Sequence, residues 1–346
     1  MPKRDHQLHG LLVIDKPGQP AANTLASPGV PVVAASHPTL QRSSSVSTRL
    51  PTSHDIVQMV RRWSGQRQIG HTGTLDPMAS GVLVLCLGNA TRLVEYYQGH
   101  PKQYYAEIVL GSATDTYDAI GEISTTAPIP ALAIAQIEAA LEQFRGDILQ
   151  TPPVYSALKQ GGESLHHKAR RGEDVTVASR PVTFYQLDLL DYKAPDRICL
   201  RAFCSAGTYI RSLAYDLGIA LQTVAHLGLL RREAAGQFTL AEARSLAEIE
   251  NMAQQDRVEE LLLPLGYGLE LPSIQLDDAQ VRRFGQGQKV ILAGASINQA
   301  QIVGALAQGK DASDRCVGIL RCVGAAIAAD AGFVWKAEKW FASSND

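Results

Sequence analysis

The chain has 346 residues, of which 45% are hydrophobic and 19% are charged, and its formal net charge is −2. This composition is typical of a globular protein and carries no overall basic signature. The apolar runs at 11–14 and 82–87 are too short for a signal-peptide core or a membrane span. Five scattered cysteines argue against a disulfide framework, so we expect a cytoplasmic protein with reduced thiols.

The first predicted element is a buried strand at 10–15, with the sequence GLLVID. Residues 19–50 are rich in Ser, Ala and Pro and show no sustained hydrophobic period, so we expect them to form a disordered insertion. A helix is predicted next, capped by Ser53 and ended by Gly65. Its apolar face consists of Ile56, Val57 and Val60.

The middle of the chain begins with an alternating segment at 103–111, QYYAEIVLG, which predicts a strand. One face of this strand holds Tyr104, Ala106, Ile108 and Leu110. A helix is predicted over 134–146. Its apolar residues are Ile134, Ile137, Leu141 and Phe144. Residues 152–180 then predict a long projecting loop that contains a short helix and the basic cluster LHHKARRG. Loops of this length in a compact domain are usually functional or disordered.

The last part of the large domain is predicted to contain a strand at 197–207 and a helix at 208–221. The helix buries Ile210, Leu213, Leu217 and Leu221. Tyr209 and Arg211 lie on the two flanks of that apolar stripe, where they can reach a cleft. Short strands separated by Gly, Asp and Ala predict a small β-rich domain at 271–346.

Asp76 lies in the segment GHTGTLDPMASGVLVLCLGNATR, residues 70–92. Asp followed by Pro is a common helix start, so one interpretation of Asp76 is a helix N-cap. The other is a catalytic carboxylate that acts alone as a nucleophile or base, because the sequence offers no paired carboxylate, metal cluster, nucleophile elbow or phosphate loop. Local spacing leaves both interpretations open.

Six segments together resemble the TruB family of tRNA pseudouridine synthases. The segment around Asp76 is similar to the catalytic motif of that family, and GLLVIDKP is similar to its first motif. KQYYAEIVLGSATDTYDAIGEI resembles the strand and acidic loop that follow, and QTPPVYSALKQGGESLHHKARRG resembles the RNA-gripping thumb. CSAGTYIRSLAYDLG and HLGLLRRE resemble the last two active-site motifs. These segments occur in the same order as in the family and together cover most of residues 10–235.

The resemblance implies an α+β pseudouridine-synthase fold with a mixed, mainly antiparallel central sheet and a small C-terminal β-rich PUA-like domain. The catalytic domain would occupy 1–265, with the thumb at 152–180, and the PUA-like domain would occupy 271–346. The implied activity is the cofactor-free and metal-free isomerisation of uridine 55 in the tRNA T-loop to pseudouridine, with base flipping. The implied partner is the T-arm stem-loop of tRNA, bound by a monomer without membrane association.

The resemblance also assigns roles to individual residues. Asp76 matches the essential aspartate and Arg211 the arginine that pairs with it. Tyr104 matches the tyrosine that stacks on the target base, and it belongs with these two in the catalytic set. The other substrate-contacting positions are His71, Tyr209 and Leu230. The RNA-backbone contacts expected from basic side chains are Lys159, Lys168, Arg170 and Arg171 on the thumb, and Arg61, Arg62 and Arg67 near the motif.

Two departures from the family pattern concern RNA docking. The insertion at 19–50 interrupts the first motif after Gly18, and His166 replaces an aromatic residue of the thumb. A non-catalytic tRNA-binding module and a synthase with a different or broader uridine target are the alternatives. The set of Asp76, Tyr104 and Arg211 favours an enzyme over a binding module, whereas the basic thumb does not discriminate between uridine targets.

Overall fold

The computed structural model describes residues 7–19, 49–156, 159–160, 163–164, 171, 177–292, 303–326 and 332–341. The insertion expected at 19–50 lies outside the described residues except at its two ends. The short helix expected within the 152–180 loop also lies outside them.

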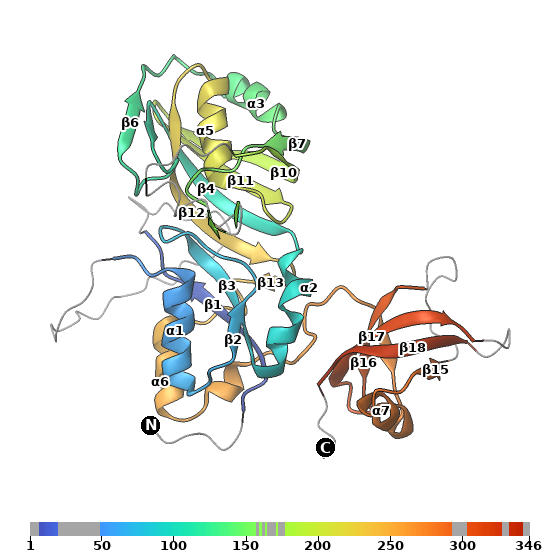
Figure 1. The fold of residues 1–346 in the computed structure, drawn as a ribbon. Coiled ribbons are helices and arrows are strands. Elements are labelled where there is room, and N and C mark those ends of the chain that lie inside the picture. Colours follow the sequence, from blue (N-terminus) through green and yellow to red (C-terminus); the bar gives the residue numbers. More distant parts are fainter. Residues whose placement is uncertain are drawn as a thin grey trace.

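A nine-stranded mixed sheet forms the centre of the fold (Figure 1). The main path runs β1-β3-β12-β4-β11-β10-β7, while β2 pairs with β3 and β13 pairs with β12. All pairs are antiparallel except β12 with β3, as expected for a mixed, mainly antiparallel sheet. The strands are β1 (Gly10–Lys16), β2 (Ile69–His71), β3 (Ser80–Leu87), β4 (Lys102–Leu110), β7 (Gly146–Gln150), β10 (Arg180–Lys193), β11 (Arg197–Cys204), β12 (Ala225–Ala235) and β13 (Phe238–Thr239).

Strands β1 and β3 are buried on both faces, which explains their nearly continuous apolar sequences. Leu12 and Ile14 face a core that includes residues of helices α1, α3, α5 and α6. Leu11 and Val13 face a second core that includes residues of η1, α2 and the C-terminal sheet. The helices are α1 (Ser53–Ser64), η1 (Gly88–Leu93), α2 (Val94–Gln98), α3 (Ile134–Glu142), α5 (Ile210–Ala220), α6 (Leu246–Gln254) and η2 (Val258–Leu261).

Helix α1 has the predicted extent but a different N-cap. Thr52, not Ser53, accepts the hydrogen bond from the Asp55 backbone N–H, and Asp55 closes a capping box with Thr52. Gly65 ends the helix in the left-handed conformation, as predicted. Ser53 is thereby free to bond the loop that carries Asp76.

The structure decides one open interpretation, the helix start at Asp76, and corrects part of one prediction, the apolar face of the helix at 134–146. No helix begins at Pro77: a turn closes with the Ala79 N–H donating to the Asp76 carbonyl, and β3 begins at Ser80. Helix α3 buries Ile137 and Leu141 as expected, but Ile134 is 63% exposed and Phe144 lies beyond the helix end. The strands at 10–15, 103–111 and 197–207 and the helix at 208–221 are confirmed.

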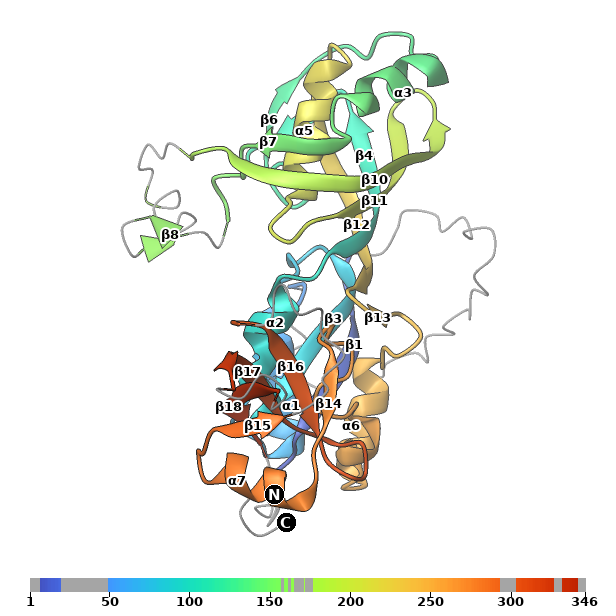
Figure 2. The same ribbon diagram turned by 90° about the vertical axis from the view of Figure 1, so that its right-hand side faces the viewer.

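The C-terminal residues form a separate five-stranded sheet, which confirms the expected β-rich fold in this region (Figure 2). Helix α7, which the sequence analysis did not predict, packs against this sheet. The sheet packs on the central one through Ile319 and Phe341, which share a core with Leu11 and Val13. Its elements are β14 (Ser273–Gln275), α7 (Asp278–Gly285), β15 (Val290–Leu292), β16 (Leu306–Lys310), β17 (Cys316–Ala325) and β18 (Phe333–Trp340).

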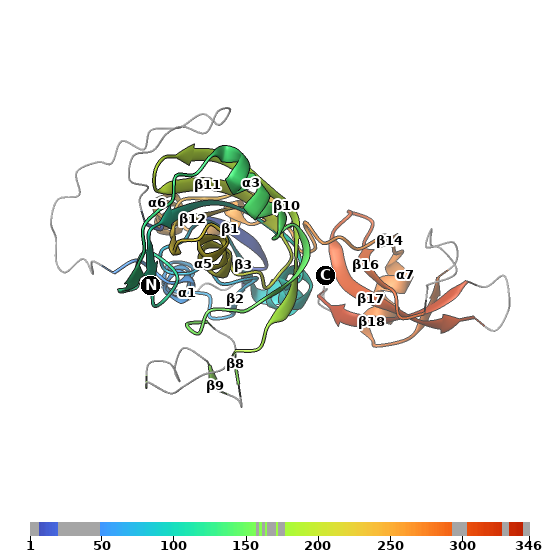
Figure 3. The same cartoon turned by 90° about the horizontal axis from the view of Figure 1, so that it is seen from above.

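Two small hairpins complete the described elements. Strands β5 (Ser112–Thr114) and β6 (Ile123–Thr126) flank the loop after β4. Strands β8 (Lys159–Gln160) and β9 (Glu163–Ser164) project from the body of the molecule, seen from above in Figure 3. All five cysteines are free thiols. None of the described helices combines the length and the apolar character needed to cross a membrane.

Candidate active site

A cavity of about 840 Å³ opens where β2, β4, β12 and the start of α5 meet. The loop between β2 and β3 carries Asp76 into its wall. Among the described residues, no three His, Cys, Asp or Glu side chains gather in a way that could hold a metal ion. The predicted site residues that line this one cavity are His71, Asp76, Tyr104, Tyr209, Arg211 and Leu230. The structure therefore brings together side chains that lie up to 159 positions apart in the sequence.

The loop around Asp76 is held by three buried side chains. Ser53 Oγ donates to the Leu75 carbonyl at 3.0 Å and accepts from the Leu75 N–H at 2.8 Å. Lys16 Nζ donates to the carbonyls of Pro77 and Ala79 at 3.0 and 2.7 Å. Burial lowers the pKa of Lys16 to about 8, which still leaves it mainly protonated at neutral pH. The loop backbone is thus fixed on both sides of the carboxylate.

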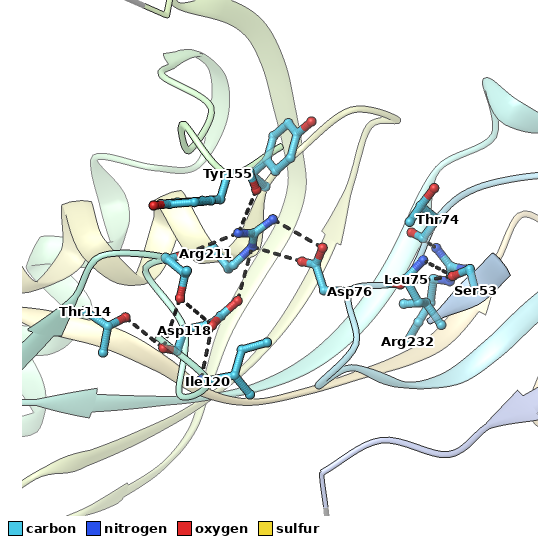
Figure 4. A network of polar contacts seen from close by, with 12 residues as sticks. Ser53, Thr74, Leu75, Asp76, Thr114, Asp118, Ile120, Tyr155, Arg211 and Arg232 are labelled. Carbon is cyan, nitrogen blue, oxygen red and sulfur yellow. Dashed lines mark hydrogen bonds and ion pairs between the residues drawn. The ribbon is translucent and has the colours of Figure 1, made fainter. Parts of the chain in front are cut away.

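Arg232 supplies the third support of this loop. Its guanidinium donates to the carbonyls of Gly73, Thr74 and Val82 at 3.1, 3.4 and 2.7 Å. Figure 4 shows the contact with Thr74. Burial raises the pKa of Tyr104, which lies opposite Arg232 in the pairing of β4 with β12. Arg232 therefore links the loop that carries Asp76 to strand β12, at the position opposite Tyr104 of β4.

Asp76 forms an ion pair with Arg211. Asp76 Oδ2 lies 2.9 Å from Arg211 Nε, and Arg211 Nη2 donates to Asp76 Oδ1 at 3.2 Å. The Arg211 side chain is 6% exposed, whereas that of Asp76 is 32% exposed. The carboxylate thus remains accessible from the cavity while its cationic partner is buried behind it.

A second carboxylate, Asp118, contacts the same guanidinium nitrogen as Asp76 (Figure 4). Its Oδ2 lies 3.7 Å from Arg211 Nε, and its side chain is 3% exposed. Burial raises the pKa of Asp118, although the Thr116 hydroxyl and Arg211 favour its ionised form. Arg211 Nη1 also donates to the carbonyls of Thr116 and Tyr155, at 3.2 and 3.1 Å. Arg211 is therefore fixed by two carboxylates and two carbonyls.

The remaining wall residues shape the cavity. Leu230 is buried on β12, and Tyr209 precedes α5, where Gln150 bonds both its N–H and its carbonyl. Burial raises the pKa of Tyr209 and lowers that of His71. His71 Nδ1 is buried and has no hydrogen-bond partner among the described residues.

The predicted thumb contacts are mostly beyond the described structure. Lys159 lies in β8, and Arg171 is described and exposed. Lys168, Arg170 and His166 lie outside the described residues. Their proposed contacts with an RNA backbone stay predictions.

The sequence analysis missed Asp118 and Arg232. The sequence carries a signal for Arg232 but none that singles out Asp118. Leu230 and Arg232 are two residues apart on one strand, so alternation places them on the same face. Asp118 lies in the acidic loop that the family resemblance included, but nothing local distinguishes it from Asp115.

Comparison with known proteins identifies the family of this chain. Residues 61–210 match the family model described as TruB family pseudouridylate synthase (N terminal domain). Residues 211–270 match the tRNA pseudouridylate synthase B C-terminal domain.

Among curated proteins, tRNA pseudouridine synthase B of Caldanaerobacter subterraneus subsp. tengcongensis is 39% identical over 237 residues, which cover 68% of this chain and 81% of that protein. The protein of the same name from Xanthomonas campestris pv. campestris is 44% identical over 241 residues, covering 69% and 78%. A solved H/ACA ribonucleoprotein bound to a substrate RNA containing 2'-deoxyuridine shares the fold, with a TM-score of 0.67, 21% identity and coverage of 97% of this chain and 86% of that chain. The chain therefore belongs to the TruB family and is a pseudouridine synthase.

Proposed function

We propose that this chain isomerises uridine 55 in the T-loop of tRNA to pseudouridine, with Asp76 as the catalytic carboxylate. The observation that carries the proposal is the placement of Asp76: a partly exposed carboxylate on the wall of a cavity, ion-paired to the buried Arg211. The curated relatives are named tRNA pseudouridine synthase B, which supports tRNA as the substrate.

The reaction needs no external reactant, because substrate and product are isomers. The bond between N1 of uracil and C1′ of ribose breaks, the base rotates, and C5 bonds to C1′. The proton on C5 is then lost, and N1 gains one. Asp76 acts on the ribose, either by attack on C1′ or as a base there, and both routes use one carboxylate.

The target base must leave the folded T-loop before it can meet Asp76. Extrusion costs on the order of a few kcal/mol, and stacking on one aromatic ring returns about 1–3 kcal/mol. Tyr104 lines the same cavity as Asp76, and in this proposal its ring provides that stacking. Phosphate contacts from basic thumb and α1 side chains supply the rest of the binding energy in this proposal.

Position-specific mapping of pseudouridine in an unmodified tRNA transcript tests the proposal. The wild-type chain should modify only the T-loop uridine, and Asp76→Asn should bind the transcript and form no product. Asp191→Asn, which changes an exposed aspartate on β10, is the matched control and should retain full activity. Turnover by Asp76→Asn would refute the role of Asp76, and wild-type product at other uridines would refute the assigned specificity. Binding by the wild type without product anywhere would favour a binding module.

A further inference from the structure

The loop that contacts Arg211 contains an unusual backbone conformation at Tyr117. Its φ is 62°, in the left-handed region that bulky side chains rarely adopt. Four non-glycine residues have a positive φ in the part of the chain that the structure describes, and Tyr117 is the only aromatic one among them. Such a conformation persists where surrounding contacts enforce it, and it is a reason to look for a role in function.

The unusual residue lies between two groups that contact the same guanidinium. On one side, the Thr116 carbonyl accepts a hydrogen bond from Arg211 Nη1 at 3.2 Å. On the other side, Asp118 Oδ2 lies 3.7 Å from Arg211 Nε. The backbone conformation of Tyr117 therefore determines the angle at which these two acceptors meet Arg211.

The Tyr117 side chain contacts the helix that carries Arg211. Its ring stacks on Tyr215, with centroids 4.2 Å apart and an interplanar angle of 16°. Tyr215 lies four positions after Arg211 on α5, so both side chains are on the same face, one turn apart. The backbone of Tyr117 is bonded separately, to the Thr114 carbonyl and the Leu227 N–H. The stack is therefore a side-chain connection between this loop and α5, next to the ion pair.

We propose that Tyr117 and Tyr215 are positioning residues whose ring stack holds Thr116 and Asp118 against Arg211, and thereby fixes the Asp76 carboxylate for catalysis. This inference rests on the proposed function of Asp76. Neither tyrosine is among the residues that line the cavity. Their effect on the reaction passes through Arg211, and their loss should lower the rate of isomerisation without weakening RNA binding.

Tyr117→Asn tests the proposal, because Asn tolerates the left-handed backbone conformation but removes the ring. We expect its single-turnover rate of pseudouridine formation to fall about three- to tenfold, the range that corresponds to one lost aromatic pair. Its affinity for a T-arm stem-loop should stay within about twofold of wild type. Tyr117→Phe keeps the stack and should restore the rate. Tyr215→Leu should reproduce the loss through the other partner.

The matched control is Tyr185→Asn, an exposed tyrosine on β10 whose ring lies 5.2 Å from that of Phe203. It should retain the wild-type rate. A wild-type rate for Tyr117→Asn would overturn the proposal. A variant that loses RNA affinity and thermal stability together with the rate would also overturn the proposal, because that result indicates a general structural role. The proposed function fails separately, if the wild type forms no pseudouridine in the T-loop or if Asp76→Asn remains active.

Discussion

Replacing Arg211 by Met should destabilise the folded chain strongly, because it leaves a buried carboxylate without its cation. Asp118 is 3% exposed and, among the described residues, would keep only the hydrogen bonds from the Thr116 hydroxyl and the Ile120 N–H. Breaking one side of a buried ion pair typically costs about 3–5 kcal/mol, and we expect a loss of unfolding free energy in that range. Asp76 contributes less to this loss, because its side chain is 32% exposed and accessible to water.

The loss should depend on pH in a direction that follows from Asp118. Burial raises the pKa of this carboxyl in the folded chain above its ordinary value of 3.8, and removing Arg211 raises it further. A carboxyl whose pKa is raised on folding destabilises the folded chain at pH values above the folded-state pKa. The penalty disappears as the pH falls through that pKa toward the unfolded-state value. The stability difference between wild type and Arg211→Met should therefore narrow from pH 7 toward pH 4.

Urea unfolding at pH 7 and at pH 4.5 measures this difference. Arg201→Met is the matched control, since Arg201 pairs with Glu233 at a partly exposed position and its loss should cost only about 0–1 kcal/mol. Adding Asp118→Asn to Arg211→Met should recover stability at pH 7. An equal loss at both pH values, or no recovery in the double variant, would refute the reasoning.

Three further substitutions have defined outcomes. Arg232→Met should lower the single-turnover rate of pseudouridine formation at least about tenfold, because the Gly73 and Thr74 carbonyls lose their donor. Its affinity for the T-arm, measured by filter binding, should stay within about threefold of wild type. A loss of affinity as large as the loss of rate would contradict this prediction. Gly81→Ala should lower the free energy of unfolding in urea by about 2–4 kcal/mol, since φ is +100° and the new Cβ would lie 2.2 Å from the Arg232 carbonyl oxygen. A loss below about 1 kcal/mol would contradict this prediction. Burial lowers the pKa of Lys16 to about 8, so the folded chain releases this proton at a lower pH than the unfolded chain. Wild type should accordingly gain stability relative to Lys16→Met between pH 8 and pH 10, and urea midpoints without that relative gain would exclude the effect.

The strands and helices that follow their own periodicity could be predicted from the sequence. Strand β4 alternates as predicted, and α5 buries the predicted stripe because each pattern matches the period of its element. The sequence could not decide whether Asp76 is a helix N-cap, and the structure shows that it is not. Asp-Pro is compatible with a turn as well as with a helix start. The choice between them depends on Ser53, Lys16 and Arg232, which bond the loop from distant segments.

The pairing around Arg211 could not be derived from spacing, because its partners lie on separate elements. Asp76 is 135 positions away and Asp118 lies in a third segment, so only the folded sheet brings them together. Family resemblance supplied the pair of Asp76 and Arg211, but it did not identify Asp118. Strand alternation from Leu230 was sufficient to place Arg232 on the cavity face, provided that Leu230 was already assigned there.

The charges around the cavity explain how one site can combine general RNA affinity with a precise reaction. Arg211 is matched by Asp76 and Asp118. In the described part of the chain, Arg232 and Lys102 form no ion pair with a carboxylate, and each donates to backbone carbonyls instead. Burial lowers the pKa of Lys102 to about 8, so it is still mostly charged at neutral pH. Lys102 lines the cavity, so under the proposed function this cation would attract an RNA phosphate. Added salt should therefore weaken binding, whereas the rate within the bound complex depends on the buried bonds to Arg211, which salt screens much less.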